Sequence, residues 1–155
     1  MAELQRTLLL VKPDGVQRQL VGRVLARFED RGLKIVGLKM VRVDRELAER
    51  HYAVHREKPF FRGLVDFITS GPLVAAALEG PNAIVIVRAM NGATRPHEAE
   101  PGSIRGDFAV ETAQNLVHAS DGPETAETEL ALWFRPEELL DYSREIDRWV
   151  LAPEE

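Results

Sequence analysis

The chain has 155 residues, a length that suits one folded domain with a substantial hydrophobic core. With 45% hydrophobic and 29% charged residues it has the composition of a globular protein, and the absence of cysteine excludes disulfides, thiolate catalysis and cysteine-based metal sites. The net charge of −5 argues against nucleic-acid binding as the main function, and no apolar run is long enough to span a membrane. The sequence also lacks a signal-peptide pattern, so we expect a cytoplasmic protein.

The first forty residues predict a strand, a helix and a second strand. Residues 6–12 form a short apolar run that predicts a buried strand ending in a turn. Apolar residues at helical spacing over 20–28 predict an amphipathic helix that ends at Gly32. Residues 33–43 carry apolar side chains on both faces, as a central strand covered on both sides does. Lys12 follows the first strand and is either a ligand-binding group or a surface lysine.

A helix that begins after Asp44, a suitable N-cap, carries His51, Tyr52 and His55. His51 and His55 are four residues apart, the spacing of two histidines that bind zinc from one helix face. The glutamate of the zinc motif is missing and no third ligand is obvious. A solvated helix face is therefore the favoured interpretation.

Residues 59–68 predict another helix, which opens with Phe60 and Phe61. Such an adjacent pair is more often part of a core than a platform for a ligand. Residues 73–78 predict a third strand, and the β-branched residues within 83–88 favour a strand by propensity as well.

Residues 92–106 show no periodicity, and a loop of this length inside a compact domain is usually functional or disordered. Arg88, Arg95 and Arg105 bracket this loop, with Thr94 among them. Guanidinium groups match phosphate oxygens in pairs, so the cluster suits a polyphosphate. A solvated basic loop is the alternative.

His118 follows a short apolar segment and precedes a turn, after which Pro123 fits the first position of a helix. Glu129 shares one face of that helix with apolar residues, where a carboxylate is costly unless it is paired. The nearest partner in sequence is His118, and a nucleophile or base held by a carboxylate is a recurring catalytic unit. The alternative is a core histidine beside a solvated glutamate. The final residues, about 143–155, include Trp149 and predict a tail that docks on its own or a neighbouring subunit.

These pieces, from about Arg6 to Tyr142, resemble the nucleoside diphosphate kinase family. Asn115-Leu-Val-His118-Ala-Ser120-Asp121 is similar to the family signature Asn-x-x-His-Gly-Ser-Asp. It is flanked, in the family's order, by Lys12-Pro13-Asp14, His51-Tyr52, Pro59-Phe60-Phe61, Arg105-Gly106-Asp107-Phe108 and Trp133-Phe134-x-Pro136-Glu137-Glu138.

The resemblance implies one domain over residues 1–155 with an α/β (α+β) fold, a ferredoxin-like sandwich in which a four-stranded antiparallel sheet carries helices on one face. It implies that residues 83–90 form a helix. The implied activity is transfer of the γ-phosphoryl group from a nucleoside triphosphate to a nucleoside diphosphate, by a ping-pong mechanism through a phosphohistidine. Mg²⁺ enters on the nucleotide phosphates, with no metal ligand from the protein.

The resemblance also implies roles for individual residues. His118 accepts the phosphoryl group, Glu129 hydrogen-bonds its imidazole, and Ser120 holds that carboxylate or the neighbouring backbone. The residues expected to contact phosphates or ribose are Arg88, Thr94, Arg105, Lys12, Tyr52 and Asn115. Phe60 stacks on the base, with Thr112 on the other face.

Three positions depart from the family pattern: Ala119 replaces a glycine, Gly122 a frequent serine, and Thr112 a common aliphatic residue. None of the three is a catalytic group. The partners implied are nucleoside di- and triphosphates and further copies of the chain, as a hexamer in preference to a tetramer. A regulatory module without turnover is the first competing function, which the presence of His118 and the arginines disfavours. A nucleic-acid-binding protein is the second, which the net charge of −5 disfavours.

Overall fold

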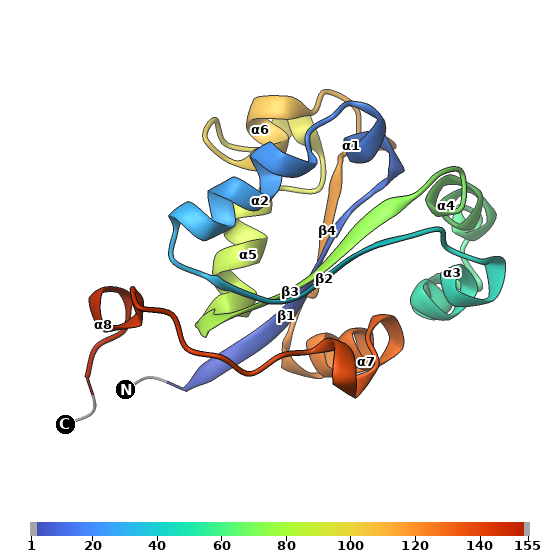
Figure 1. The fold of residues 1–155 in the computed structure, drawn as a ribbon. Helices are drawn as coiled ribbons and strands as arrows, with labels where there is room; N and C mark the ends of the chain where they lie inside the picture. The colour runs from blue at the N-terminus through green and yellow to red at the C-terminus, as the bar shows by residue number, and fades with distance from the viewer. Residues whose placement is uncertain (1–2, 154–155) are drawn as a thin grey trace.

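The computed structural model describes residues 3–153. Four strands form one antiparallel sheet in the order β2-β3-β1-β4 (Figure 1). The strands are β1 (Leu4–Val11), β2 (Lys34–Val41), β3 (Leu73–Pro81) and β4 (Val117–Ala119). The sheet and its helices confirm the predicted ferredoxin-like α/β fold.

Helices cover both faces of this sheet, as Figure 1 shows. One face carries α1 (Pro13–Gln17), α2 (Val21–Asp30), α5 (Ala83–Asn91) and α6 (Ile104–Phe108). The other carries α3 (Arg45–His51), α4 (Phe61–Ile68) and α7 (Pro123–Trp133). Short helices η1 (Ala53–His55), η2 (Pro96–Glu98), η3 (Pro136–Glu138) and α8 (Asp147–Val150) lie in the connections and the tail.

The expectation of helices on one face only is wrong, and β1 shows why. Leu8 and Leu10 point into one core and Leu9 and Val11 into the other, because successive side chains of a strand face opposite sides. All four side chains are fully buried. A strand that is apolar on both faces has to be covered on both faces.

Two predictions about single elements are wrong because tertiary packing, and not local sequence, decides the outcome. The second strand, β2, is an edge strand and not a central one, and its residues Leu38 and Met40 are 52% and 63% exposed. Residues 83–88 belong to helix α5, as the family resemblance implies, and not to a strand. Ala83, Ile84 and Val87 are buried on one helix face, so packing on the sheet outweighs their β propensity.

The C-terminal tail packs on its own chain. The Tyr142 hydroxyl donates a hydrogen bond to the Ile35 carbonyl, and Lys34 donates to the Tyr142 carbonyl. Further on, the side chain of Val150 lies against Gly32, whereas Trp149 is 80% exposed. Residues 154–155 of the predicted tail lie outside the described part of the chain. Between residues 3 and 153, none of the helices is both long and apolar enough to cross a bilayer.

Replacing Gly32 by alanine should destabilise the fold. Gly32 has a φ of +101°, and an added Cβ would lie 2.8 Å from Cγ1 of Val150. The left-handed backbone alone costs an alanine about 1–2 kcal/mol. We expect the melting temperature to fall by several degrees.

Gly22→Ala is the matched control, because Gly22 lies in α2 and an added Cβ meets nothing within 4 Å. That change should raise stability by about 0.5–1 kcal/mol. Thermal unfolding of both variants checks the pair, and an unchanged melting temperature for Gly32→Ala would contradict the strain argument.

Candidate active site

The centre of the site is the pairing of His118 with Glu129. Nε2 of His118 lies 3.1 Å and 3.0 Å from the two carboxylate oxygens of Glu129. Strand β4 delivers the histidine, whose side chain is 27% exposed, and helix α7 delivers the carboxylate, which is 12% exposed. Within residues 3–153 the other ring nitrogen, Nδ1, makes no hydrogen bond to the protein. Glu129 is one of the buried residues of α7, so its predicted inward orientation is confirmed.

Ser120 fixes the position of that carboxylate. Its hydroxyl donates to Oε1 of Glu129 at 2.7 Å and accepts a hydrogen bond from the Leu8 backbone N–H at 3.3 Å. Burial, the largest influence, raises the pKa of Glu129, but hydrogen bonds from His118 and Ser120 and the nearby imidazoles together outweigh it and hold that pKa below its ordinary value. Glu129 is therefore an anion at neutral pH.

His51 forms the wall behind the nucleophile. Its ring lies edge-on to that of His118 with the centroids 4.6 Å apart, and Nδ1 lies 3.8 Å from Oε2 of Glu129. The indole N–H of Trp133 donates to Nδ1 at 3.1 Å, so the ring proton of neutral His51 is on Nε2. Burial, with the charge of His118, lowers the pKa of His51 to about 3, so the ring is neutral at neutral pH. The solvated helix face favoured from the sequence is wrong for His51, which is buried and packs against His118.

A second group joins Lys12, Asn115 and Thr94. Nζ of Lys12 donates to Oδ1 of Asn115 at 2.5 Å, and Nδ2 of Asn115 donates to the Thr94 carbonyl at 2.9 Å. Burial lowers the pKa of Lys12 to about 8; Asp14 counteracts this and Arg105 adds to it. Asn115 thus connects the ammonium after β1 to the loop for which the sequence predicted either phosphate binding or a solvated basic loop.

Arg105 is buried and holds three carbonyl groups of the surrounding backbone. Nε donates to Asn115 at 3.1 Å, Nη1 to Gly92 at 2.8 Å and Nη2 to Val117 at 2.6 Å. Burial, together with the charge of Arg88, lowers the pKa of Arg105 to about 10, so it stays protonated at neutral pH. A guanidinium has five N–H groups, and these three bonds leave two for a ligand. Arg88 is exposed on α5.

Sequence reasoning missed two residues that fix the loop before the nucleophile. The Leu116 N–H donates to Oδ2 of Asp14 at 3.0 Å, and its carbonyl accepts from the Lys12 N–H at 2.8 Å. These bonds hold Leu116 at a φ of +74°, a conformation that branched residues rarely adopt. Nothing in the sequence marks Leu116. Asp14 could have been found from its place beside Lys12 in the family motif.

The remaining predicted residues lie around these groups. Tyr52 caps α3 and its ring contacts that of His51 edge-on at 4.8 Å; burial, then the charge of Glu129, raises its pKa to about 12. Phe60 is 50% exposed and contacts the ring of His55, with centroids 5.4 Å apart. Thr112 is exposed on the loop before Asn115. The base-binding roles of Phe60 and Thr112 stay predictions.

Comparisons with known proteins connect this arrangement to one family. The family model described as "Nucleoside diphosphate kinase" matches residues 5–139. A nucleoside diphosphate kinase from Thermomicrobium roseum is 58% identical over 149 residues, which are 96% of this chain and 100% of that protein. The chain belongs to the nucleoside diphosphate kinase family. The resemblance seen in the sequence is thereby confirmed.

Other members of the family agree. A nucleoside diphosphate kinase from Archaeoglobus fulgidus is 55% identical over 147 residues, 95% of this chain and 97% of that protein. The solved structure of a halophilic nucleoside diphosphate kinase from Halobacterium salinarum in complex with CDP has a TM-score of 0.93 at 49% identity, and the match covers 96% of this chain and 99% of that chain. As a nucleoside diphosphate kinase the chain is an enzyme, a kinase-type transferase that uses nucleotides.

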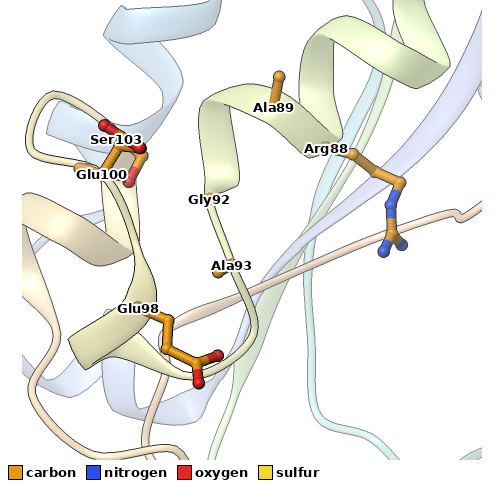
Figure 2. Close-up of a pocket in the computed structure, with 7 residues that line it drawn as sticks. All are labelled: Arg88, Ala89, Gly92, Ala93, Glu98, Glu100 and Ser103. Atoms are coloured by element: carbon orange, nitrogen blue, oxygen red, sulfur yellow. Dashed lines mark hydrogen bonds between the residues drawn. The ribbon is translucent and has the colours of Figure 1, made fainter.

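One cavity borders the site without belonging to it. Figure 2 shows it between the end of α5 and the following loop, lined by Glu98, Glu100 and Ser103, with Arg88 at its rim. The side chain of Arg88 extends away from Glu100 and Ser103. The carboxylates of Glu98 and Glu100 disfavour an anionic ligand in this cavity.

Arg105→Lys should cost far more stability than Arg88→Lys. One ammonium cannot reach all three carbonyls that Arg105 holds, and each buried carbonyl left unpaired costs about 1–3 kcal/mol. We expect the free energy of unfolding to fall by about 2–4 kcal/mol for Arg105→Lys. The exposed Arg88 should change it by no more than about 0.5 kcal/mol. Urea unfolding of the two variants decides, and equal losses would show that the three bonds contribute nothing.

Proposed function

We propose that this nucleoside diphosphate kinase transfers the γ-phosphoryl group of a nucleoside triphosphate to a nucleoside diphosphate through a covalent phosphohistidine on His118. The observation that carries the proposal is the geometry of one ring: Nε2 faces a buried carboxylate at 3.0 Å and 3.1 Å, while Nδ1 makes no protein hydrogen bond within residues 3–153. A carboxylate on one nitrogen fixes the tautomer and leaves the lone pair of the other nitrogen for attack.

The reaction consists of two mirrored displacements. Nδ1 of His118 attacks the γ-phosphorus, the bond from that phosphorus to the β–γ bridging oxygen breaks, and the nucleoside diphosphate leaves with the electron pair. A second nucleoside diphosphate then attacks the phosphohistidine through a terminal β-oxygen, and the P–N bond breaks. Glu129 stabilises the positive charge that develops on the ring while it is phosphorylated. Ser120 keeps the carboxylate in place through both steps.

The basic groups around the ring suit the triphosphate. Half-buried Lys12 and buried Arg105 are cations beside the loop that carries Thr94, and Arg88 adds an exposed guanidinium. In phosphoryl transfer most of the catalysis comes from positioning and from neutralising the charge on the transferred group. Asn115 is hydrogen-bonded to Lys12, which supports its expected contact with ribose or phosphate, as does the nearness of Tyr52 to His51.

Mg²⁺ would bind through the nucleotide and not through a protein cage. The side chains around the ring are mainly cations, amides and imidazoles, whereas Mg²⁺ prefers six oxygen ligands. Glu129 already accepts from His118 and Ser120, and Asp14 accepts from Leu116. When bound on the phosphates the ion supplies further charge neutralisation to the transferred group.

The assembly of the enzyme and its place in the cell remain predictions. Leu38 and Met40 on the edge strand and Trp149 in the tail are exposed apolar side chains, which supports the expected homo-oligomer. Sedimentation of the purified chain would distinguish a hexamer from a tetramer. The cytoplasmic location rests on the sequence expectation alone.

The test of the proposed function is covalent labelling. Incubation with γ-labelled ATP and Mg²⁺ should label the chain with a phosphate that is stable to base and released by acid. Addition of a nucleoside diphosphate should discharge it. His118→Ala should show no label and His97→Ala, on exposed η2, should label normally. Label retained in His118→Ala, or initial-rate kinetics of a sequential mechanism, would overturn the proposal.

Glu129→Gln should slow phosphorylation of His118 by roughly 10–1000-fold, because a neutral amide cannot stabilise the charge on the ring. Nucleotide affinity should change little. Glu127→Gln is the matched control, since Glu127 lies on the exposed face of the same helix. Stopped-flow phosphorylation and nucleotide Kd measure the two effects separately. A normal rate in Glu129→Gln would remove the orienting role, and a loss of affinity alone would place Glu129 in nucleotide binding.

The pH dependence should reveal Lys12. Its pKa of about 8 lies below the ordinary lysine value, so the ammonium is lost as pH rises through about 8 in the nucleotide-free enzyme. Since kcat/KM reports the groups of the free enzyme, we expect it to fall on the alkaline side with a midpoint near that pH. Lys12→Arg, whose charge persists, should move the midpoint upward. An alkaline midpoint unchanged by this substitution would assign the titration to another group.

A further inference from the structure

The two histidines next to Glu129 form a cluster that phosphoryl transfer does not explain in full. His51, His118 and Glu129 each offer one ligand atom, and these three atoms lie within 4.8 Å of one another. The proposed mechanism uses His118 and Glu129 but gives His51 no chemical step. Two imidazoles and one carboxylate are the ligands of a common type of zinc site, in which the fourth position is open.

We propose that His51, His118 and Glu129 bind a borderline divalent transition-metal ion, with Zn²⁺ as the reference ion, and that its binding reversibly inhibits the enzyme. This goes beyond the proposed function, although it shares His118 with it.

The present distances are close to those a metal requires. Zinc bonds of about 2.0–2.1 Å to nitrogen and oxygen place neighbouring ligand atoms of a tetrahedron roughly 3.3 Å apart. Nε2 of His118 and Nδ1 of His51 lie 3.0 Å and 3.8 Å from the same oxygen, Oε2 of Glu129. The two ring nitrogens lie within 4.8 Å of each other, so coordination needs the rings to rotate toward a common ion. Trp133 would lose its acceptor on Nδ1 of His51, a hydrogen bond of 3.1 Å.

The surroundings hold the ligands in place. Ser120 donates to Oε1 of Glu129, so it orients the carboxylate while leaving Oε2 for the ion. Hydrogen bonds of this kind orient the ligands of metal sites. The side chain of His51 is 1% exposed and that of Glu129 is 12% exposed, whereas His118 is 27% exposed. An ion can thus enter from the side of His118 and keep a water in the fourth position.

The ligand types select against the ion that the reaction uses. Mg²⁺ is a hard cation that prefers oxygen ligands in octahedral geometry, whereas imidazole nitrogens suit zinc, copper and nickel. The cluster therefore discriminates between the Mg²⁺ that accompanies the nucleotide and a transition-metal ion.

A metal ion bound at this site would prevent phosphorylation of His118. An ion on Nε2 of His118 replaces the contact with the Glu129 carboxylate and withdraws electron density from the ring. The neutral imidazole that binds the ion through Nε2 carries its ring proton on Nδ1, so Nδ1 has no lone pair with which to attack phosphorus. Removal of the ion by a chelator restores the pair.

Binding is tested without nucleotide, so that metal on phosphate oxygens cannot contribute. Zn²⁺ is titrated into the full chain by calorimetry, with Co²⁺ as a second probe whose visible absorption reports four-coordinate geometry. We expect one ion per chain and a Co²⁺ spectrum of the four-coordinate type. His51→Asn and, as a second variant, Glu129→Gln should each weaken Zn²⁺ binding by at least about 10-fold. His97→Asn, the matched control on exposed η2, should bind like the parent protein. Thermal unfolding confirms that each variant is folded.

Inhibition is measured on the same proteins after excess zinc has been removed. Phosphorylation of His118 by γ-labelled ATP with Mg²⁺ should be slowed in the zinc-treated parent and restored by EDTA, and zinc treatment should have much less effect on His51→Asn. Binding that is unchanged in both His51→Asn and Glu129→Gln, a six-coordinate Co²⁺ spectrum, or equal affinity for Mg²⁺ would overturn the proposal. None of these outcomes bears on phosphohistidine formation, and a chain that binds zinc but accepts no label would refute the proposed function alone.

Discussion

The register between β1 and β4 is the constraint on which the site depends. Leu10 pairs with His118, and Leu9 and Val11 pair with Ala119 and Val117. Because side chains alternate along a strand, this register places His118 on the face covered by α7, which carries Glu129. Val117 and Ala119 point into the opposite core. A slip by one residue would bury His118 in an apolar core and leave Glu129 without its main partner.

The same strand places the other functional groups. Ser120 exchanges hydrogen bonds with Leu8 through its hydroxyl and its N–H, so it continues the pairing of β1 beyond the end of β4. Lys12 follows directly after β1 and holds the Leu116 carbonyl through its backbone N–H. The backbone of β1 therefore couples the positions of Lys12, Ser120 and His118.

The pKa values in this site reflect two opposing influences: burial disfavours the charged form of each group, and nearby charges and hydrogen-bond donors can favour it. Burial disfavours the charges of Lys12 and Arg105 and lowers both pKa values, a cost that the nucleotide phosphates would offset under the proposed function. Glu129 shows the opposite balance, since its donors outweigh its burial and keep its pKa low. At His51 the charge of Glu129 only partly offsets burial, so the ring stays neutral and forms a shaped wall beside the nucleophile. A nucleoside diphosphate kinase site is thus preorganised for an anionic ligand before it binds one.

The sequence by itself determined the motifs, the buried first strand, the helix that carries Glu129 inward and the family, because local periodicity and motif order report these directly. Only the tertiary structure decided the rest. The second strand lies at the edge of the sheet and residues 83–88 form a helix, because burial against the sheet depends on neighbours that are distant in sequence. The ring of His51 contacts that of His118, because α3 packs beside α7. The left-handed conformation of Leu116 could not be predicted for the same reason: its hydrogen bonds to Asp14 and Lys12, which are distant in sequence, impose a conformation that the local sequence disfavours.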